Sequence, residues 1–504
     1  MNMERLCELK KTGEYRRLGH LFYTSRSAFL YDTGTGKVIK LDEDAQEFME
    51  CLFDEKTTEQ ELRGLINNSS DIGSICEFIQ KENLLCNPEV TNFVDLTPYY
   101  YSDDIQCEQL TIELTGNCNL RCKYCIYNDY YEGSRSFNTS NIDFETAKKA
   151  IDYVYSHSSK ERMAITFYGG EPLLNFKVMK QCIDYCLSYI KRPNLHFSFT
   201  TNLTLMTEEI ADYVAQVPNM SILLSLDGPE EIHNRARVNR DGKGSFSDAF
   251  NGLKLLANAI NKYKKATIMF NAVLMPPYTE KRFDLINNFF ESLDFLPDGT
   301  EVQATYPVAK SIPAGYIKEL EDRGEANIEK ITWIDWAKKR ANDNLDFGKM
   351  RNLYADVLRA GLTQIHNRLL YEKPIGRPYY NGCCIPGRRR LYVCTDGSYK
   401  LCERIGNAPP IGHVDTGINA EVVKQYYLAD YERKSIPDCS RCWAINLCDI
   451  CYAQCYDEKG LNIAMKKKQC ANVKERSLEL LRDYYELVES KPKLIEEIAK
   501  IEVT

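Results

Sequence analysis

The sequence predicts an α/β protein built around a partial (β/α)6 barrel. Short apolar runs with strand character alternate with helical patterns over residues 107–310, which indicates βαβ units and a parallel sheet. There are only six such units, too few to close an eight-stranded barrel, so we expect an open barrel with its chemistry at the carboxyl ends of the strands. The predicted strands are 110–114, 164–168, 195–200, 222–226, 266–273 and 302–306, with helical patterns that include 144–155, 178–190 and 246–260.

Residues 1–95 are predicted to form a separate winged-helix domain, because a hairpin is followed by three helical patterns. The hairpin is indicated by apolar runs on either side of Thr33-Gly-Thr-Gly. The helices are predicted after Asp42, after a capping box formed by Thr58 and Glu61, and near residues 75–83. The first two helices are acidic, so DNA is a poor partner for this domain.

The other boundaries follow from composition. The turn-rich segment 96–106 is expected to be a linker before the barrel at 107–310. A charged helical bridge at 311–375, a cysteine-dense domain at 376–472 and a C-terminal helix at 473–504 complete the predicted organisation.

Composition and charge limit the classes of function. The chain has 504 residues, of which 44% are hydrophobic and 27% charged, as is typical of globular proteins. The net charge of −8 argues against a nucleic-acid-binding groove. No signal peptide or membrane-spanning run is evident, so we expect a cytoplasmic protein that binds neither nucleic acid nor membrane. In that reducing compartment the 20 cysteines are expected to be metal or cluster ligands rather than disulfides.

The most informative motif is Cys118-x3-Cys122-x2-Cys125, which follows the first predicted strand of the barrel. Three thiolates at this spacing can share one iron–sulfur cluster, and without a fourth local cysteine one iron keeps an open position for chemistry. A structural zinc site is the alternative, although it would require four ligands. The spacing, with Tyr124 before the last cysteine, resembles the cluster loop of radical S-adenosylmethionine (SAM) enzymes. The resemblance implies that the open iron binds SAM and that an electron cleaves the sulfonium to give a 5′-deoxyadenosyl radical.

Further motifs resemble SAM-binding positions of the same family. Tyr168-Gly-Gly-Glu-Pro ends the second strand and resembles the family's G-G-E-P motif, whose backbone and acidic side chain bind the amino group of SAM. Ser225 and Asn202 lie at strand ends where the family contacts the ribose and carboxylate of SAM. Arg237 resembles the arginine that pairs with the SAM carboxylate, for which a planar guanidinium is suited. Asn202 and Asp227 are the weaker matches, because Asn and Asp at strand ends are most often plain turn formers. The cofactor-binding positions implied by the resemblance are Tyr124, Gly169, Gly170, Glu171, Pro172, Asn202, Ser225 and Arg237.

The cysteine-dense domain resembles the SPASM extension of radical SAM enzymes, which holds two auxiliary [4Fe–4S] clusters. The family pattern has a cysteine where this chain has Tyr452, so Cys451 or Cys455 is expected to replace it. Cys383 and Cys394 are additional candidates for the same incomplete cluster, and paired zinc sites are the alternative for all these thiols. The resemblance assigns Cys439, Cys442, Cys448 and Cys470 to the distal cluster and Cys384 and Cys402, with Cys451 or Cys455, to the other. Scattered cysteines at 7, 51, 76, 86, 107, 182 and 186 are expected to be buried core thiols.

Together the resemblances imply a SPASM-type radical SAM peptide maturase with three [4Fe–4S] clusters and SAM as cofactors. The N-terminal domain resembles the RiPP recognition element, which binds the leader of a ribosomally made precursor peptide. This implies that the leader adds as a strand to the hairpin edge within 22–41, against the helix near 75–85. The implied reaction is a crosslink in the precursor, a thioether in the first instance with C–C and C–O bonds as alternatives, and the electron donor a flavodoxin or ferredoxin.

Two rival functions share parts of this pattern. An anaerobic sulfatase maturase, which oxidises Cys or Ser to formylglycine, has nearly every cluster motif but does not need the N-terminal domain. A non-catalytic, zinc-stabilised peptide-binding protein would use the same thiols without iron.

Overall fold

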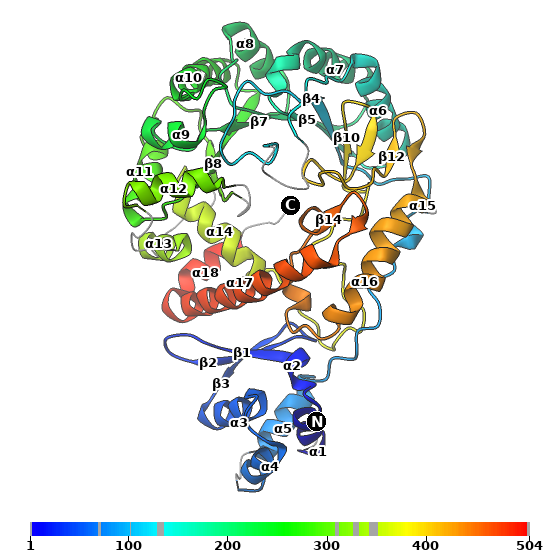
Figure 1. Ribbon diagram of the computed structural model, residues 1–504, viewed down its shortest axis with the longest axis vertical. Helices are drawn as coiled ribbons and strands as arrows, with labels where there is room; N and C mark the ends of the chain where they lie inside the picture. Colours follow the sequence, from blue (N-terminus) through cyan, green and yellow to red (C-terminus); the bar gives the residue numbers. More distant parts are fainter. Residues whose placement is uncertain are drawn as a thin grey trace.

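The central feature of the molecule is a sheet in which six parallel strands lie side by side in the order in which they occur along the chain (Figure 1). The computed structural model describes residues 3–68, 72–100, 102–128, 136–307, 312–325, 332–341 and 351–500. All six predicted strands are present, and each pairs in parallel with the next. They are β4 (Gln109–Thr115), β5 (Arg162–Gly169), β6 (Asn194–Thr201), β7 (Met220–Ser225), β8 (Ala266–Val273) and β9 (Glu301–Thr305). The predicted parallel α/β architecture is therefore confirmed.

Helices cover the outer face of this sheet and form the rim seen in Figure 1. Several begin at residues whose side chains accept a hydrogen bond from the first turn, as at Asp143, Thr207 and Thr279. Their buried faces pack on the strands in one apolar core. The helices are α6 (Phe144–His157), α7 (Phe176–Tyr189), α8 (Glu208–Gln216), α9 (Glu230–Ala236), α10 (Phe246–Tyr263) and α11 (Glu280–Glu291).

The sheet does not end at the barrel. β10 (Arg390–Val393), from the cysteine-dense segment, pairs in parallel with β4, so that Leu391 lies opposite Leu110. Three short antiparallel strands then extend the sheet: β11 (Ser398–Lys400), β12 (Gly412–His413) and β13 (Gly417–Ile418). The cysteine-dense segment is thus hydrogen-bonded into the same sheet as the barrel.

The remaining helices connect and close the molecule. The predicted C-terminal helix begins at Ile463, earlier than residue 473, and is interrupted at Lys491 before Pro492. Cys470 therefore lies on this helix. The elements are α12 (Ala314–Asp322), α13 (Trp333–Arg340), α14 (Leu353–His366), α15 (Ala420–Val422), a π-helical segment (Val423–Ala429), α16 (Asp430–Cys439), the hairpin β14 (Tyr456–Asp457) and β15 (Gly460–Leu461), α17 (Ile463–Ser490) and α18 (Pro492–Ala499).

The N-terminal unit contains the predicted hairpin and three following helices, together with elements that were not predicted. The capping box is present, because Thr58 N donates to Glu61 at 2.7 Å and Glu61 N donates to the Thr58 hydroxyl at 3.3 Å. The additional elements are α1 (Met3–Thr12), α2 (Tyr15–Leu18) and a third strand, β1 (Gly19–Tyr23). The predicted ones are β2 (Ala28–Asp32), β3 (Val38–Leu41), α3 (Glu43–Phe53), α4 (Glu59–Asn68) and α5 (Ile72–Lys81).

Both faces of the three-stranded sheet β1–β2–β3 are covered. One face, which includes Leu30, packs against the helices of the N-terminal unit. The other presents Phe22 and Phe29, which contact the ring of Tyr485 on α17 at centroid distances of 5.7 and 5.0 Å. These residues belong to the same apolar core as the barrel. The N-terminal unit is thus packed on the C-terminal helix rather than attached by a linker alone (Figure 1).

The scattered cysteines were expected in the core. Cys7, Cys76, Cys107, Cys182 and Cys186 are buried, as predicted. Cys51 is only half-buried. Cys86 is exposed just after α5, so that prediction was wrong. None of the described helices combines the length and apolar character needed to cross a membrane.

Candidate functional site

The loop that carries Cys118, Cys122 and Cys125 follows β4, at the carboxyl edge of the sheet. Its backbone is held to the segment after α9: Arg121 N donates to Val238 O at 2.7 Å, and Lys123 N donates to Ala236 O at 2.8 Å. The loop is therefore fixed between β4 and the end of α9.

The three thiols lie together, with Cys118 buried and Cys122 and Cys125 half-buried. Burial, followed by the Glu171 carboxylate and the other two thiols, raises the pKa of Cys118 to about 12, and burial together with Cys122 raises that of Cys125 to about 12. Burial raises the pKa of Cys122 as well. Thiolates in such a place require a compensating cation, which a metal centre supplies.

The Gly169-Gly170 turn is joined to the cysteine loop by its backbone. Gly170 N donates to Thr115 O and Glu171 N to Asn117 O, each at 2.9 Å. Gly169 has φ +137°, and a Cβ at either glycine would overlap the loop backbone. The two glycines thus allow the cysteine loop, rather than a bound ligand, to approach closely. Pro172 then begins a short 3-10 helix, Pro172–Asn175.

The Glu171 carboxylate is buried and accepts three hydrogen bonds from the protein. The donors are the Thr201 hydroxyl at 2.8 Å, Asn202 N at 2.8 Å and Leu173 N at 3.1 Å. Burial raises its pKa to about 7, although these bonds act in the opposite direction. This carboxylate joins the glycine turn to the end of β6. Its contact with the amino group of SAM stays a prediction, and that amino group would have to compete with the three protein donors.

Asn202 lies beside the cysteine loop, and its contact with SAM stays a prediction. Its amide Nδ2 is 3.9 Å from the Sγ atom of Cys118 and donates to Asn119 Oδ1 at 3.0 Å. Leu120 N also approaches the same sulfur, at 3.4 Å. Ser225 ends β7 and is buried, opposite Asn271 of β8.

Arg237 forms a buried ion pair with Asp227. The guanidinium Nε lies 3.0 Å from Asp227 Oδ2, and the two side chains are 7% and 2% exposed. The Tyr124 hydroxyl donates to the same carboxylate oxygen at 2.7 Å, and Val273 N donates to Oδ1 at 3.0 Å. The turn-former interpretation of Asp227 was therefore wrong, because its side chain organises a buried network.

The same arginine also reaches the cysteine loop. Its Nη1 lies 3.8 Å from Cys122 Sγ, and the guanidinium stacks on the Tyr124 ring at 5.3 Å. Burial alone would lower the pKa of Arg237, but the Asp227 carboxylate raises it above its ordinary value. A permanent cation is thus held beside the thiols.

Sequence reasoning missed two residues that position Arg237. His233 is fully buried and lies 3.1 Å from the Ser245 hydroxyl through Nε2, and that hydroxyl donates to Arg237 O at 3.0 Å. Burial lowers the pKa of His233 to about 4, so its ring is neutral. The only sequence signal was a single histidine four residues before the arginine.

The residues around Cys118, Cys122 and Cys125 fit an iron–sulfur cluster. They provide one buried and two half-buried thiols, backbone and amide donors to the sulfur of Cys118, and the Arg237 guanidinium near Cys122, which are features that stabilise and tune such clusters. Within the described ranges, no group of three or more Cys, His, Asp and Glu side chains is arranged to hold a single metal ion.

A second group of thiols surrounds the start of α17. Burial raises the pKa of Cys439, Cys442 and Cys448, and neighbouring thiols, Cys470 among them, raise it further. The ammonium group of Lys466, which is 2% exposed, lies 3.4 Å from Cys439 Sγ and 4.3 Å from the Tyr431 ring centroid. The structure thus brings the four predicted distal ligands together, next to a buried cation.

The structure distinguishes Cys451 from Cys455. Burial raises the pKa of both Cys402 and Cys451; Cys451 raises that of Cys402 further, and Cys384 raises that of Cys451, so these three form one neighbourhood. Cys455 is fully buried and donates to Cys451 O at 3.3 Å. Burial raises the pKa of Cys383 well above its ordinary value, with Cys455 as the first of its thiol neighbours, and Cys451, Cys448 and Cys470 raise the pKa of Cys455. Of the two candidates, Cys451 is the one placed with Cys384 and Cys402.

Comparisons with known proteins relate the parallel sheet and its cysteine loop to radical SAM proteins. Residues 112–290 match the family model of the Radical SAM superfamily. The cysteine-type anaerobic sulfatase-maturating enzyme of Clostridium novyi (strain NT) is 31% identical over 188 residues, 36% of this chain and 47% of that protein. The radical SAM cyclopropyl synthase TigE of Paramaledivibacter caminithermalis (strain DSM 15212 / CIP 107654 / DViRD3) is 28% identical over 192 residues, 36% of this chain and 38% of that protein. The chain thus spans about half or less of the length of these relatives.

Solved structures show a similar fold. Native anSMEcpe with bound AdoMet and Kp18Cys peptide aligns with a TM-score of 0.52 at 19% identity. The alignment covers 78% of this chain and 99% of that one, so the likeness extends beyond the residues of the family model.

Proposed function

We propose, starting from the radical SAM domain at residues 112–290, that this chain is a peptide-modifying radical SAM enzyme that installs a crosslink in a ribosomally made precursor. The crosslink is a thioether in the first instance, with C–C and C–O bonds as alternatives. The clusters and SAM, when bound, supply the radical and take up the electron released as the new bond forms. The residues described here hold those groups, orient them and exclude water.

The observation that carries the proposal is the buried site around Cys118, Cys122 and Cys125. The glycine turn fixes the loop, Asn202 faces one sulfur, and Arg237 faces another. Donors and charges of this kind orient cluster ligands and tune their potential. We assign Tyr124, Ser225 and Arg237 to the side of the site where SAM binds.

The second thiol group supports a place for two auxiliary clusters. Cys439, Cys442, Cys448 and Cys470 would hold one. Cys384, Cys402 and Cys451 would hold the other with three thiolates, which leaves an open iron to bind a substrate thiolate. The sulfatase-maturating relatives act on a protein, as their names state.

The N-terminal unit is assigned to recognition of the precursor leader. It combines an antiparallel sheet with flanking helices, and an extended peptide can lengthen such a sheet. A flavodoxin or ferredoxin is the proposed electron donor.

The direct test is formation of 5′-deoxyadenosine by anaerobically reconstituted, chemically reduced protein with SAM. Replacing Cys118, Cys122 and Cys125 with Ala should abolish it. Cys86→Ala, which removes an exposed thiol away from the site, should leave it unchanged. Deoxyadenosine formation by the triple variant would overturn the assignment, as would zinc without iron and sulfide in the purified protein.

The second candidate is a sulfatase-maturating activity, which the similarity to the Clostridium novyi enzyme favours. Co-expression with a short precursor encoded beside this gene separates the two. A precursor that loses two hydrogens supports the crosslink. Formylglycine in a sulfatase peptide, with no change in the precursor, supports the rival.

A further inference from the structure

One edge of the N-terminal sheet is open for pairing. In the described part of the chain β1 pairs only with β2, so its other side is a free edge. Leu18 O accepts from Thr33 N at 3.0 Å, and Thr24 N donates to Ser27 O at 2.9 Å. Along an antiparallel strand, residues that hydrogen-bond to the partner strand alternate with residues that do not. Because Leu18 and Thr24 bond to the β2 side, the odd-numbered residues between them direct their N–H and C=O groups away from β2. Those residues are Gly19, Leu21 and Tyr23.

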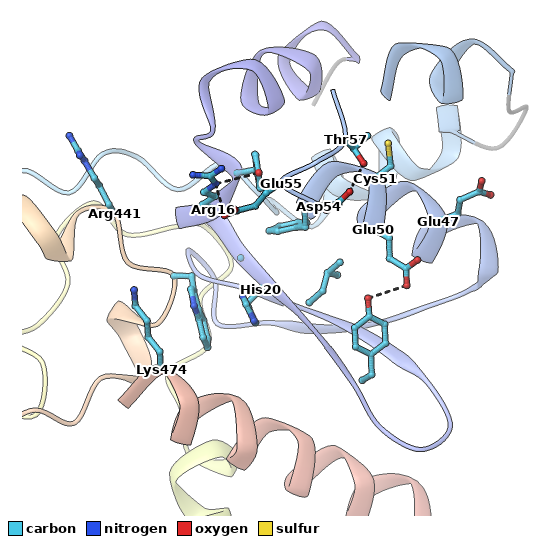
Figure 2. Close-up of a pocket in the computed structure, with 16 residues that line it drawn as sticks. Arg16, His20, Glu47, Glu50, Cys51, Asp54, Glu55, Thr57, Arg441 and Lys474 are labelled. Carbon is cyan, nitrogen blue, oxygen red and sulfur yellow. Dashed lines mark hydrogen bonds and ion pairs between the residues drawn. The ribbon is translucent and has the colours of Figure 1, made fainter. Parts of the chain in front are cut away.

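A groove lies along this edge. It has a volume of about 860 Å³ and runs between α3 on one side and the Trp443 loop with α17 on the other (Figure 2). Its apolar lining includes Tyr15 and Phe53, whose rings are in contact at 5.6 Å, and Trp443, which stacks on His20 at 4.4 Å. The groove therefore offers unpaired backbone groups and aromatic walls together.

Opposite charges lie at the two ends of the groove. Arg441 and Lys474 lie at the end near His20 (Figure 2), and no carboxylate of the described residues pairs with either. Glu47 and Glu50 lie at the other end, where the Tyr23 hydroxyl donates to Glu50 at 3.0 Å. Between them Arg16 lies 3.3 Å from Glu55, and the Asp54 carboxylate accepts hydrogen bonds from Lys56 N and the Thr57 hydroxyl.

We infer that this groove binds an extended segment of the polypeptide substrate as a fourth strand beside β1. The segment carries an acidic side chain near Arg441 and Lys474 and a basic one near Glu47 and Glu50. Main-chain pairing supplies affinity, and the two charged ends fix the register. This inference rests on the proposed function for the identity of the polypeptide, while the groove itself rests on the geometry of β1.

The location differs from the one expected from the resemblance. The opposite edge of the sheet is β3, next to α5, where the flanking lysines are engaged: Lys37 pairs with Glu82 at 2.7 Å and Lys40 with Glu489 at 3.0 Å. The β1 edge instead faces the cysteine-dense segment, which provides Arg441 and Trp443. A peptide held there would run between the N-terminal unit and the auxiliary thiols.

The test uses a display library of random peptides of about ten residues, long enough to span one strand, against the full-length, cluster-loaded protein. Enriched peptides should contain a stretch of alternating apolar residues with an acidic residue at one end and a basic residue at the other. Tyr23→Pro removes one outward N–H but keeps the pairs with β2. It should weaken an enriched peptide about tenfold, as expected for one lost strand hydrogen bond. Tyr23→Ala, which loses the same ring but keeps the N–H, should stay within about threefold of the wild type.

A second pair of variants keeps the test decisive if proline disturbs β1. Glu47→Lys should weaken binding severalfold at low salt, whereas Glu77→Lys, on the exposed face of α5, should not. The inference is overturned if no peptide is enriched, or if the enriched peptides bind the Tyr23→Pro and Glu47→Lys proteins as well as the wild type.

Failure of the groove and failure of the proposed function can be told apart. Deoxyadenosine formation without substrate is measured on the same variants and does not depend on β1. If it is present but no peptide binds at β1, the groove alone is wrong. If peptides bind at β1 but no deoxyadenosine forms in any protein, the proposed function is wrong and the groove remains.

Discussion

Replacing Asp227 with Asn tests whether the network beside the cysteine loop is a buried ion pair. The substitution keeps the shape of the side chain but removes its charge. Arg237, with its side chain 7% exposed, would then be a buried cation without its counter-ion at 3.0 Å. The Tyr124 hydroxyl would donate to a neutral amide oxygen instead of a carboxylate.

The expected cost follows from this geometry. Removing one partner of a buried ion pair destabilises a protein by roughly 3–5 kcal/mol, because the remaining charge is uncompensated. Removing both charges, in Asp227→Asn with Arg237→Met, leaves no such charge. The double variant should therefore have a free energy of unfolding about 2–3 kcal/mol higher than the value obtained by adding the losses of the two single variants.

The measurement is the free energy of unfolding from urea titrations of anaerobically purified protein. Asp298→Asn, at an exposed position, is the matched control and should lie within about 0.5 kcal/mol of the wild type. The reasoning is refuted if Asp227→Asn stays within about 1 kcal/mol of the wild type, or if the two single costs simply add in the double variant.

Three further predictions follow from the described contacts. Gly170→Ala places a Cβ against Asn117 O, so it should destabilise the protein by about 1–3 kcal/mol and lower the iron bound per chain, whereas Gly64→Ala, with nothing within 4 Å, should do neither. His20 has its pKa lowered to about 4 by burial first and by Arg482 and Lys474 second. The unfolded chain therefore binds the proton first, and wild-type stability should fall relative to His20→Gln by about 3 kcal/mol at most as the pH drops from about 6.5 to about 4, seen in melts at several pH values. Lys466→Met removes a buried donor to Cys439. In the loaded protein it should lower the midpoint potential of the distal cluster by about 60 mV or more in an EPR-monitored titration, and an unchanged potential would reject a tuning role.

The parallel sheet was predictable because its signals are local. Each of the six strands is a short apolar run bounded by turn residues, and each predicted helix has its apolar face at the helical spacing. β1 and α1 were missed for the opposite reason. The segment Gly19–Tyr23 directly follows the short charged helix α2 and has no clean alternation, and its strand form depends on pairing with β2 and on contact between Phe22 and Tyr485.

The candidate site was predictable in its ligands but not in its contacts. Cysteine spacing indicates which thiols can converge, and the structure brings Cys118, Cys122 and Cys125 together. Nothing in the spacing shows that Glu171 accepts three protein donors, or that Asp227 pairs with Arg237. Glu171 follows β5 and two of its donors lie at the end of β6, so that pairing exists only after the sheet has formed, while Asp227 and Arg237 are brought together by the turn and helix α9 between them. The choice between Cys451 and Cys455 likewise depends on which way the chain turns after Ile450.

Because β10 pairs in parallel with β4, the barrel and the cysteine-dense segment form one structural unit. A barrel cut before residue 376 would expose the backbone of β4 along a full strand edge, which is a template for aggregation. The cysteine-dense segment would lose the support of the same ladder. The two parts therefore should unfold in one cooperative transition and cannot be exchanged between proteins by joining sequences at the motif boundary. Any recombination of this architecture has to carry β10 with the barrel.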